Sequence, residues 1–248
     1  MAYAVFRTFE ELKSAIKKVK SQNISGTEFW YRGQGNATYE LTPSFFRYPS
    51  NSPEKEKEIF ETYCRYAQRV GVSRNEVKTD WENLIDMQHY FIPTRLLDWT
   101  ETLGISLYFA LSGYRGEGNI ALFLLNPVKL NSYSFHEKII PTIPEDTRDL
   151  SYAKSYIAST PPVAQYPIAI RTNFSNPRVL AQRGMFTVHG ADTSPIDKLC
   201  PDAVYKLVIG STAVPEIKEF LTDANINEAT VFPDIFGLAS LLRAKLAN

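Results

Sequence analysis

The chain of 248 residues carries 27 basic and 27 acidic side chains, so its formal net charge is zero. This balance disfavours a protein that coats nucleic-acid backbones, because such proteins carry a basic excess. It does not exclude a local basic groove on the surface. Hydrophobic residues make up 44% of the chain and charged residues 22%, as in an ordinary globular protein. We expect one large domain over residues 1–248, with its core at about 25–240.

The two cysteines, Cys64 and Cys200, lie far apart and lack the spacing of a zinc site or a disulfide framework. A reducing, cytoplasmic environment therefore fits the sequence best. The first residues show no basic region followed by an apolar run, so we expect no signal peptide. No apolar run approaches the roughly 18 residues that span a bilayer, and we expect no membrane partner.

The first third of the chain begins with a predicted helix and a predicted strand. Thr8 opens a capping box, and apolar residues follow it at helical spacing. Residues 28–32 are rich in aromatic side chains, which favours a strand. Ser52, Pro53 and Glu54 supply the cap, the first-turn proline and the first-turn acid that are typical of a second helix.

The middle of the chain is predicted to hold two more helices. Asp80 should cap a helix that stops before Pro93, because the residue ahead of a proline is pushed out of the helical conformation. Residues 94–99 would then form an extended connector. Thr100 is expected to cap the next helix, which would end near Gly113.

Strand signals dominate the second half. Residues 119–125 form a continuous apolar run and should make a central strand. Three further strands are expected at residues 167–171, 185–189 and 204–209. Residues 126–162 contain five prolines, so we expect an excursion over the surface, with a short helix at 149–157, that forms one wall of a cleft.

The last part of the chain is predicted to be mainly helical. Ser211 or Thr212 should cap a helix that ends at Asp223. Residues 229–232 would be a short extended piece, or the entry to a last helix over 233–247. A helix-rich first half and a strand-rich second half predict a single α+β domain with a mixed or mainly antiparallel sheet.

The stretch from residue 85 to residue 100, IDMQHYFIPTRLLDWT, mixes many hydrogen-bonding side chains with large apolar ones. Arginine and aspartate are rarely fully buried unless paired, so we expect a polar network set into the core. One interpretation is an ion pair between Arg95 and Asp98 that stabilises the connector. His89 could be an acid or base, since its ordinary pKa is near neutrality, or a structural residue with satisfied hydrogen bonds.

Arg32 ends an aromatic strand and is followed by Gly33. An arginine at this position can bind a phosphate or a carboxylate bidentately, and the glycine lets a ligand approach the backbone. The alternative is a structural arginine that pairs with a carboxylate such as Asp98. The chain has three histidines and no HxH or HExxH pattern, so we expect no metal site.

The string Q-H-Y-x-x-P-T-R-L-L-D-W-T stands beside three other motifs: Tyr31-Arg32-Gly33, Gln182-Arg183-Gly184 and Phe232-Pro233-Asp234. Together they resemble the FRG domain, a family named for its Phe-Arg-Gly-like motif, over most of the chain. We expect a site in a cleft whose ligand-binding residues come from these motifs. They are Arg32, Gln34, Gln88, His89, Thr94, Arg95, Asp98 and Gln182.

A second, fainter resemblance connects Tyr31-Arg32-Gly33 and the late Glu228 with Arg-dependent ADP-ribosyltransferases. In that superfamily the arginine holds the phosphates or ribose of NAD, and the glutamate stabilises an oxocarbenium-like transition state. The resemblance implies these catalytic roles for Arg32 and Glu228, with NAD as substrate. The superfamily's middle Ser-Thr-Ser element is not visible here. A purely structural alternative makes Glu228 the capping acid of the last helix.

Three function hypotheses follow. The first is an NAD-dependent transferase or glycohydrolase of the ADP-ribosyltransferase type, acting as a toxin or in phage defence. The second is a non-catalytic module that binds a nucleotide, a nucleic acid or a protein. The third is a structural interaction domain in which the polar residues only stabilise the fold. The sequence does not identify the acceptor of a transferase.

Overall fold

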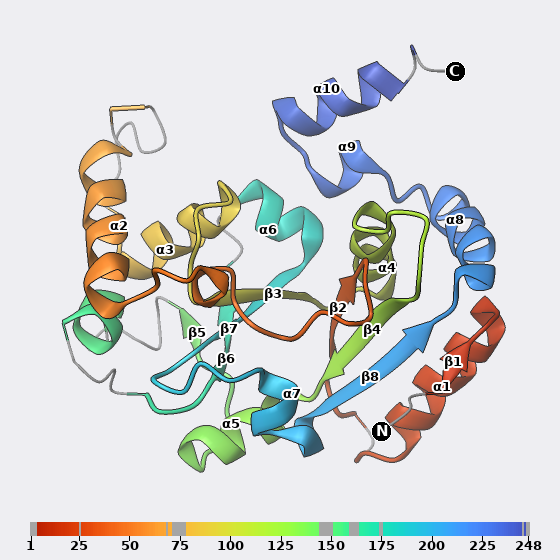
Figure 1. Ribbon diagram of the computed structural model, residues 1–248, viewed down its shortest axis with the longest axis horizontal. Coiled ribbons are helices and arrows are strands. Elements are labelled where there is room, and N and C mark those ends of the chain that lie inside the picture. The colour runs from red at the N-terminus through yellow and green to blue at the C-terminus, as the bar shows by residue number, and fades with distance from the viewer. Residues whose placement is uncertain are drawn as a thin grey trace.

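The computed structural model describes residues 4–24, 26–67, 69–70, 78–143, 151–158, 164–173, 176–244 and 246. Its centre is an eight-stranded sheet in the order β1-β8-β4-β2-β3-β7-β6-β5, with helices around it (Figure 1). The strands are β1 (Val5–Phe6), β2 (Trp30–Gln34), β3 (Leu96–Thr100), β4 (Ile120–Leu125), β5 (Thr142–Ile143), β6 (Ile168–Thr172), β7 (Gly184–Val188) and β8 (Val204–Ile209). The pairs β1–β8 and β5–β6 are parallel and the other five pairs are antiparallel. The predicted α+β fold with a mixed, mainly antiparallel sheet is therefore confirmed.

Helices surround this sheet along the whole described chain. They are α1 (Phe9–Ser21), α2 (Pro53–Tyr66), α3 (Asp80–His89), α4 (Leu103–Ser112), α5 (Pro127–Phe135), α6 (Pro177–Gln182), α7 (Ile196–Leu199), α8 (Val214–Asp223), α9 (Glu228–Val231) and α10 (Ile235–Ala244). Shorter turns of helix are η1 (Phe45–Arg47), η3 (Ala153–Ile157), η4 (Pro201–Ala203) and η5 (Ser211–Ala213). None of the described helices is long and apolar enough to cross a membrane.

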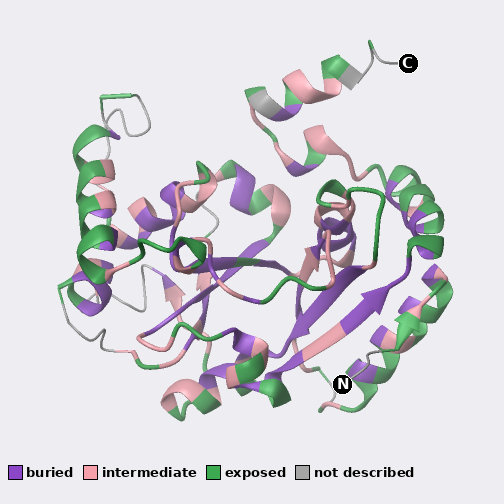
Figure 2. Cartoon of the chain, in the orientation of Figure 1, coloured by how far each residue is buried: buried purple, intermediate pink, exposed green. Residues whose placement is uncertain are grey.

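Strand β4 is the most buried element, and all six of its residues are fully inaccessible (Figure 2). Because successive strand residues face opposite sides of a sheet, Ile120, Leu122 and Leu124 pack in one apolar cluster with residues of α1, α4 and α8. The alternate residues of β4 pack in a second cluster that includes Trp99 and Leu130. A third cluster joins α2, α3 and η3 to β3 and β7. The continuous apolar run was thus correctly predicted to be a central strand.

Several predicted elements are corrected by the structure. Most of the expected connector is strand β3, which is paired with β7 along its whole length. Thr100 does not cap a helix, since its hydroxyl donates to the backbone oxygen of Gln182 (2.6 Å), and Thr102 occupies the N-cap position of α4. Residues 228–231 form the short helix α9, which Asn227 caps, and not an extended piece. The cap of α3 is Thr79, with Asp80 as its first helical residue.

The excursion after β4 is more regular than expected, because it contains helix α5, which Asn126 caps. Tyr152 and Tyr156 belong to its other described part and are buried, so this part adds to the core beneath α2 and α3. Much of the expected helix at 149–157 is the π-helical turn η3. Residues 144–150 and 159–162 of the excursion lie outside the described residues.

The expected ion pair between Arg95 and Asp98 is wrong, because Arg95 pairs with Glu56 of α2. Side chains three residues apart in extended backbone point to opposite faces, so the two cannot meet. Arg95 Nε donates to Glu56 (2.6 Å) and Nη1 donates to the backbone oxygens of His189 (2.7 Å) and Gly190 (3.1 Å). Although burial opposes its charge, the bonds and the charge of Glu56 raise the pKa of Arg95. This network joins α2 to the end of β7.

We expect Glu56→Gln to lower the free energy of unfolding by about 3–5 kcal/mol, since it leaves the buried charge of Arg95 without its partner. Urea denaturation measures this change. The control is Glu58→Gln on the same helix, whose carboxylate is exposed and bonds Lys55; it should change stability by less than about 0.5 kcal/mol. Equal effects of the two substitutions would contradict a structural role for the Arg95–Glu56 pair.

His189 should make stability fall as the pH falls. Its ring is inaccessible to solvent, and burial above all lowers its pKa to about 3. Below the ordinary histidine pKa of about 6.5 the unfolded chain takes up a proton that the folded chain refuses. The free energy of unfolding therefore falls as the pH is lowered from 6.5 to about 3. His189→Gln should reduce the slope of this free energy with pH by the contribution of about one proton. An equal shift of the unfolding curve between pH 7 and pH 5 in the wild type and in His189→Gln would contradict this role of His189.

Candidate functional site

The two halves of the sheet meet at the junction of β2 and β3, which is held by a single register pair, Tyr31 with Thr100. By contrast, β2 pairs with β4 over five residues and β3 pairs with β7 over five. We call this junction the β2–β3 seam. No other register pair joins the two strands, and residues of both strands line a cavity at this place.

Gly33 brings helix α4 close to this seam. A Cβ at Gly33 would lie 1.8 Å from the backbone oxygen of Ser106 and 2.8 Å from the backbone nitrogen of Ala110. Only glycine allows β2 and α4 to approach so closely. The motif that contains Arg32 therefore fixes the position of α4 as well as that of the arginine.

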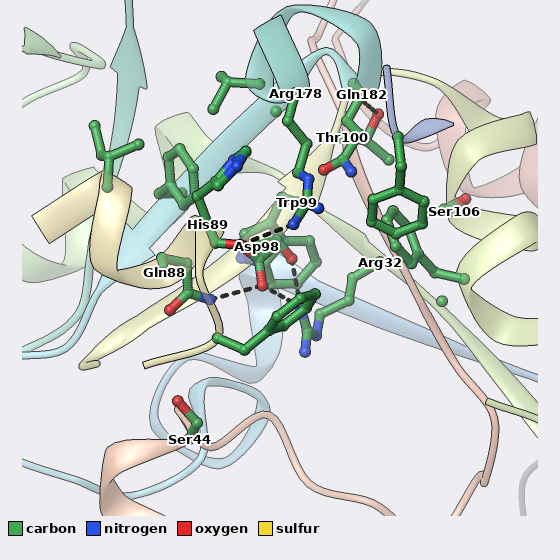
Figure 3. Close-up of a pocket in the computed structure, with 18 of the residues that line it drawn as sticks. Arg32, Ser44, Gln88, His89, Asp98, Trp99, Thr100, Ser106, Arg178 and Gln182 are labelled. Carbon is green, nitrogen blue, oxygen red and sulfur yellow. Dashed lines mark hydrogen bonds and ion pairs between the residues drawn. The ribbon is translucent and has the colours of Figure 1, made fainter. Parts of the chain in front are cut away.

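A cavity of about 370 Å³ lies over the seam, between α3, α4 and α6 (Figure 3). Its polar and charged lining residues are Arg32, Ser44, Arg47, Gln88, His89, Asp98, Thr100, Ser106, Arg178 and Gln182. Its aromatic lining residues are Tyr31, Phe91, Trp99, Phe109, Phe186 and Phe232. An apolar cavity with a few convergent polar groups has the usual character of a small-molecule site.

Arg32 bridges the seam with its side chain. Its Nη1 donates to the backbone oxygen of Asp98 (2.7 Å) and lies 3.6 Å from Asp98 Oδ2. The predicted alternative of an Arg32–Asp98 pair is confirmed. The Nε atom of Arg32 is buried and bonds none of the described residues. Burial lowers the pKa of Arg32, Asp98 opposes this, and the nearby positive charge of Arg47 adds to it.

A series of hydrogen bonds, which begins at a backbone N–H group, orients the Asp98 side chain. The backbone N–H of Leu96 donates to Thr94 Oγ1 (3.0 Å), and the Thr94 hydroxyl donates to Gln88 Oε1 (2.5 Å). Because its oxygen already accepts, Gln88 turns its amide nitrogen to Asp98 Oδ2, to which it donates (2.8 Å). The Asp98 side chain keeps 53% of its surface exposed, unlike its buried neighbours on β3.

Arg47 was not predicted from the sequence, yet it lines the same cavity, and its charge acts on Arg32. Turn η1 carries it and is docked on Thr94, whose backbone oxygen accepts from the N–H of Phe45 (3.1 Å) and whose N–H donates to Ser44 Oγ (3.3 Å). Arg47 is exposed, and no carboxylate of the described residues forms an ion pair with it. The lining therefore holds more positive than negative charge.

Arg178 is another lining residue that was not predicted from the sequence. Its Nη1 donates to the backbone oxygen of His89 (2.8 Å) and its Nη2 donates to Asp234 (2.9 Å). Its guanidinium lies over the rings of Phe91 (5.3 Å) and Phe232 (4.6 Å), which are cation–π contacts. Phe91 has a left-handed backbone (φ 60°), a costly conformation for an aromatic residue and one that often accompanies functional sites.

His89 lies in the wall of the cavity beside Arg178. Its Nδ1 atom is buried and bonds none of the described residues. Burial and the charge of Arg178 lower the pKa of His89, so the neutral imidazole is favoured at neutral pH. It can therefore offer one donor and one acceptor to a ligand.

Residues 228–234, which we call the strap, cover the cavity on the side of α4 and α6. Glu228 accepts a hydrogen bond from the Tyr108 hydroxyl of α4, and the backbone oxygen of Val231 accepts from Gln182 of α6 (3.2 Å). Burial and the bond to Glu228 raise the pKa of Tyr108. The strap ends at the Asp234 that pairs with Arg178, and Phe232 between these contacts lines the cavity.

Five of the predicted site residues line this cavity: Arg32, Gln88, His89, Asp98 and Gln182. The other four predicted residues do not. They are Gln34, which donates to the backbone oxygen of Glu40, Thr94, which orients Gln88, Arg95, which lies in the core network, and Glu228, which bonds Tyr108. The functional role of all nine stays a prediction. The excursion at 126–162 was expected to form one wall of a cleft. None of its described residues lines this cavity, but Lys129, Ser132 and Tyr133 line a separate pocket beside Cys200 and Tyr205.

A metal site is not evident in the part of the chain that the structure describes, where no three or more His, Cys, Asp or Glu side chains gather.

Comparison with known proteins gives one match. Residues 27–119 match the family model of the FRG domain. This span contains β2, η1, α3, β3 and α4, and thus Arg32, Arg47 and Asp98, but it ends before Arg178 and the strap. No curated protein and no solved structure matches the chain. The match supports the FRG resemblance for this part of the chain and says nothing of ADP-ribosyltransferase activity.

We expect Arg178→Gln to loosen the strap, because it removes the pair with Asp234 and the cation–π contact with Phe232. Amide hydrogen exchange over residues 228–234 should rise several-fold, while exchange in β4 should not change. The control is Arg183→Gln, which removes an exposed arginine 3.7 Å from Glu101. Unchanged exchange in the Arg178 variant would show that other contacts hold the strap.

Proposed function

We propose that this protein binds a nucleotide in the cavity over the β2–β3 seam, with NAD as the first candidate. The observation that supports the proposal is a pair of guanidinium groups, Arg32 and Arg47, beside a cavity whose described lining contains one carboxylate, Asp98. We choose NAD as the first nucleotide to test because the sequence resembles NAD-dependent ADP-ribosyltransferases.

The arginine pair favours an anionic ligand. The charge of Arg47 acts against that of Arg32, and the Nε of Arg32 bonds none of the described residues. A phosphate group would accept hydrogen bonds from Arg32 and Arg47. It would also neutralise the positive charge that Asp98 alone does not balance. Ser44 adds a hydroxyl at the same end of the cavity, since it lies on the side of Arg32 and away from Arg178 (Figure 3).

The other end of the cavity favours a planar ring. Phe109 and Phe232 contact each other edge to face there, with ring centroids 6.0 Å apart. Gln182 bonds the backbone oxygen of Val231 next to Phe232, and Arg178 lies over the Phe232 ring and bonds the backbone oxygen of His89. Polar groups near an aromatic surface suit the recognition of a nucleobase or a nicotinamide ring. A nucleotide, in which the sugar lies between the phosphate and the planar base, would match a cavity with arginines at one end and aromatic rings at the other.

Two other hypotheses from the sequence make different demands. A nucleic-acid or protein partner would need a surface beyond this cavity, and nucleic-acid binding would depend steeply on salt. A transferase or glycohydrolase of the ADP-ribosyltransferase type needs the same nucleotide site plus a carboxylate at the reacting bond. A toxin or phage-defence role stays a prediction from the sequence.

Calorimetric titration with NAD, AMP, adenosine and inorganic phosphate tests the proposal. We expect NAD and AMP to bind and adenosine to bind more weakly, because the arginines act on the phosphate. Arg47→Gln should weaken the binding of NAD at least about tenfold, which corresponds to about 1.4 kcal/mol. Arg47 has no structural partner among the described residues, so this variant should keep the melting temperature of the wild type.

Arg32→Gln should weaken binding further but also lower the melting temperature by a few degrees, because Arg32 bonds Asp98 across the seam. Arg115→Gln, an exposed arginine outside the lining, is the matched control and should bind as the wild type does. Failure of the wild type to bind any nucleotide, or equal affinities in all three variants, would overturn the proposal. Binding of an oligonucleotide in preference to NAD would favour the nucleic-acid hypothesis instead.

A further inference from the structure

We propose that Asp98 is the catalytic carboxylate of the cavity and that the protein breaks the N-glycosidic bond of the bound nucleotide. The inference rests on the proposed nucleotide binding and adds a reaction class and a reacting group. It also moves the catalytic role from Glu228, where the resemblance to ADP-ribosyltransferases placed it, to a residue that lines the cavity.

Asp98 is the one carboxylate among the described lining residues. Along β3 the other four residues are buried, and only Asp98 is exposed. The structural carboxylate of Glu56, by comparison, is enclosed by its partners in the core network. The Asp98 side chain instead keeps 53% of its surface accessible, and Figure 3 shows its carboxylate between Gln88 and Arg32.

The position of the Asp98 carboxylate is set by groups that do not need a ligand. Thr94 is 2% exposed and fixes the orientation of the Gln88 amide, which donates to Oδ2. Arg32 lies 3.6 Å from the same oxygen. No described residue donates to the other oxygen, Oδ1, which stays available for a reacting group. Preorganised charge of this kind is the usual source of stabilisation for a charged transition state.

The order of the groups in the cavity points to the sugar. In a nucleotide the ribose lies between the phosphate and the base. If Arg32 and Arg47 hold the phosphate and the aromatic end holds the ring, a carboxylate next to Arg32 faces the ribose. The ribose carbon that carries the base gains positive charge when the N-glycosidic bond lengthens, and an anion within a few ångströms stabilises that charge.

With NAD the reaction balances without an oxidant or a reductant. The bond between ribose C1′ and the pyridinium nitrogen breaks, and its electron pair goes to the nitrogen, so neutral nicotinamide leaves. The cation at C1′ is stabilised by Asp98. A water oxygen then bonds C1′, its proton passes to Asp98 and on to solvent, and the products are ADP-ribose, nicotinamide and a proton.

Glu228 provides a matched comparison. It lies on the strap, accepts from the Tyr108 hydroxyl, and is not among the lining residues. The Glu228 carboxylate therefore has a structural partner in Tyr108. Its substitution should affect the position of the strap and not the reaction itself. The two carboxylates make opposite predictions, which one assay can separate.

The test measures nicotinamide release from NAD by chromatography, and NAD binding by calorimetry, on the same preparations. Asp98→Asn keeps the shape of the side chain and an oxygen that can accept from Gln88. We expect its kcat to fall at least about hundredfold while the Kd for NAD changes less than about threefold. Glu228→Gln should keep kcat within about threefold of the wild type.

Gln88→Ala is a second variant, which leaves Asp98 in place but without its orienting donor. We expect a lower kcat with an unchanged Kd, and this result does not depend on the folding of the Asp98 variant. Wild-type protein that binds NAD but releases no nicotinamide would overturn the inference and leave the binding proposal intact. So would full activity in Asp98→Asn, or loss of activity only in Glu228→Gln. Wild-type protein that binds none of the nucleotides tested would overturn both proposals, whereas protein that binds AMP but not NAD would overturn only the inference on NAD cleavage.

Discussion

The bond from Arg32 Nη1 to the backbone oxygen of Asp98 is the interaction on which the site depends. Two adjacent strands usually satisfy their backbone groups through a continuous ladder. Here β2 and β3 share one register pair, and a side chain spans the gap that a ladder would have closed. The gap holds the cavity, and the same arginine both joins the two halves of the sheet and presents its guanidinium to a ligand.

The alternation of side chains along extended backbone separates two polar networks that share one stretch of sequence. Arg95 points away from the cavity, and its network is buried and joins α2 to β7. Asp98, three residues later, points toward the cavity, and its network is half exposed. The first network stabilises the fold, since a buried charge must keep its partner. The second is open on one side, which is the arrangement expected where a ligand completes the hydrogen bonds.

The sequence allowed good predictions where the signal is local. The apolar run of β4, the boundaries of β8 and the cap of α1 follow from residues within a few positions of each other. The short strand β3 could not be distinguished from a connector, because its pairing with β7 joins segments about ninety residues apart. The same limit hid Arg178, whose partner Asp234 lies 56 residues away, and Arg47, which reaches the cavity only because η1 docks on Thr94.

A co-crystal structure of the chain with NAD tests the central claim most directly. The account predicts a phosphate group within hydrogen-bond distance of Arg32 and Arg47, and the ribose beside Asp98. It also predicts a planar ring next to Phe109 and Phe232. NAD bound at another surface would contradict the account, as would a cavity that holds only water at an NAD concentration that saturates binding in solution.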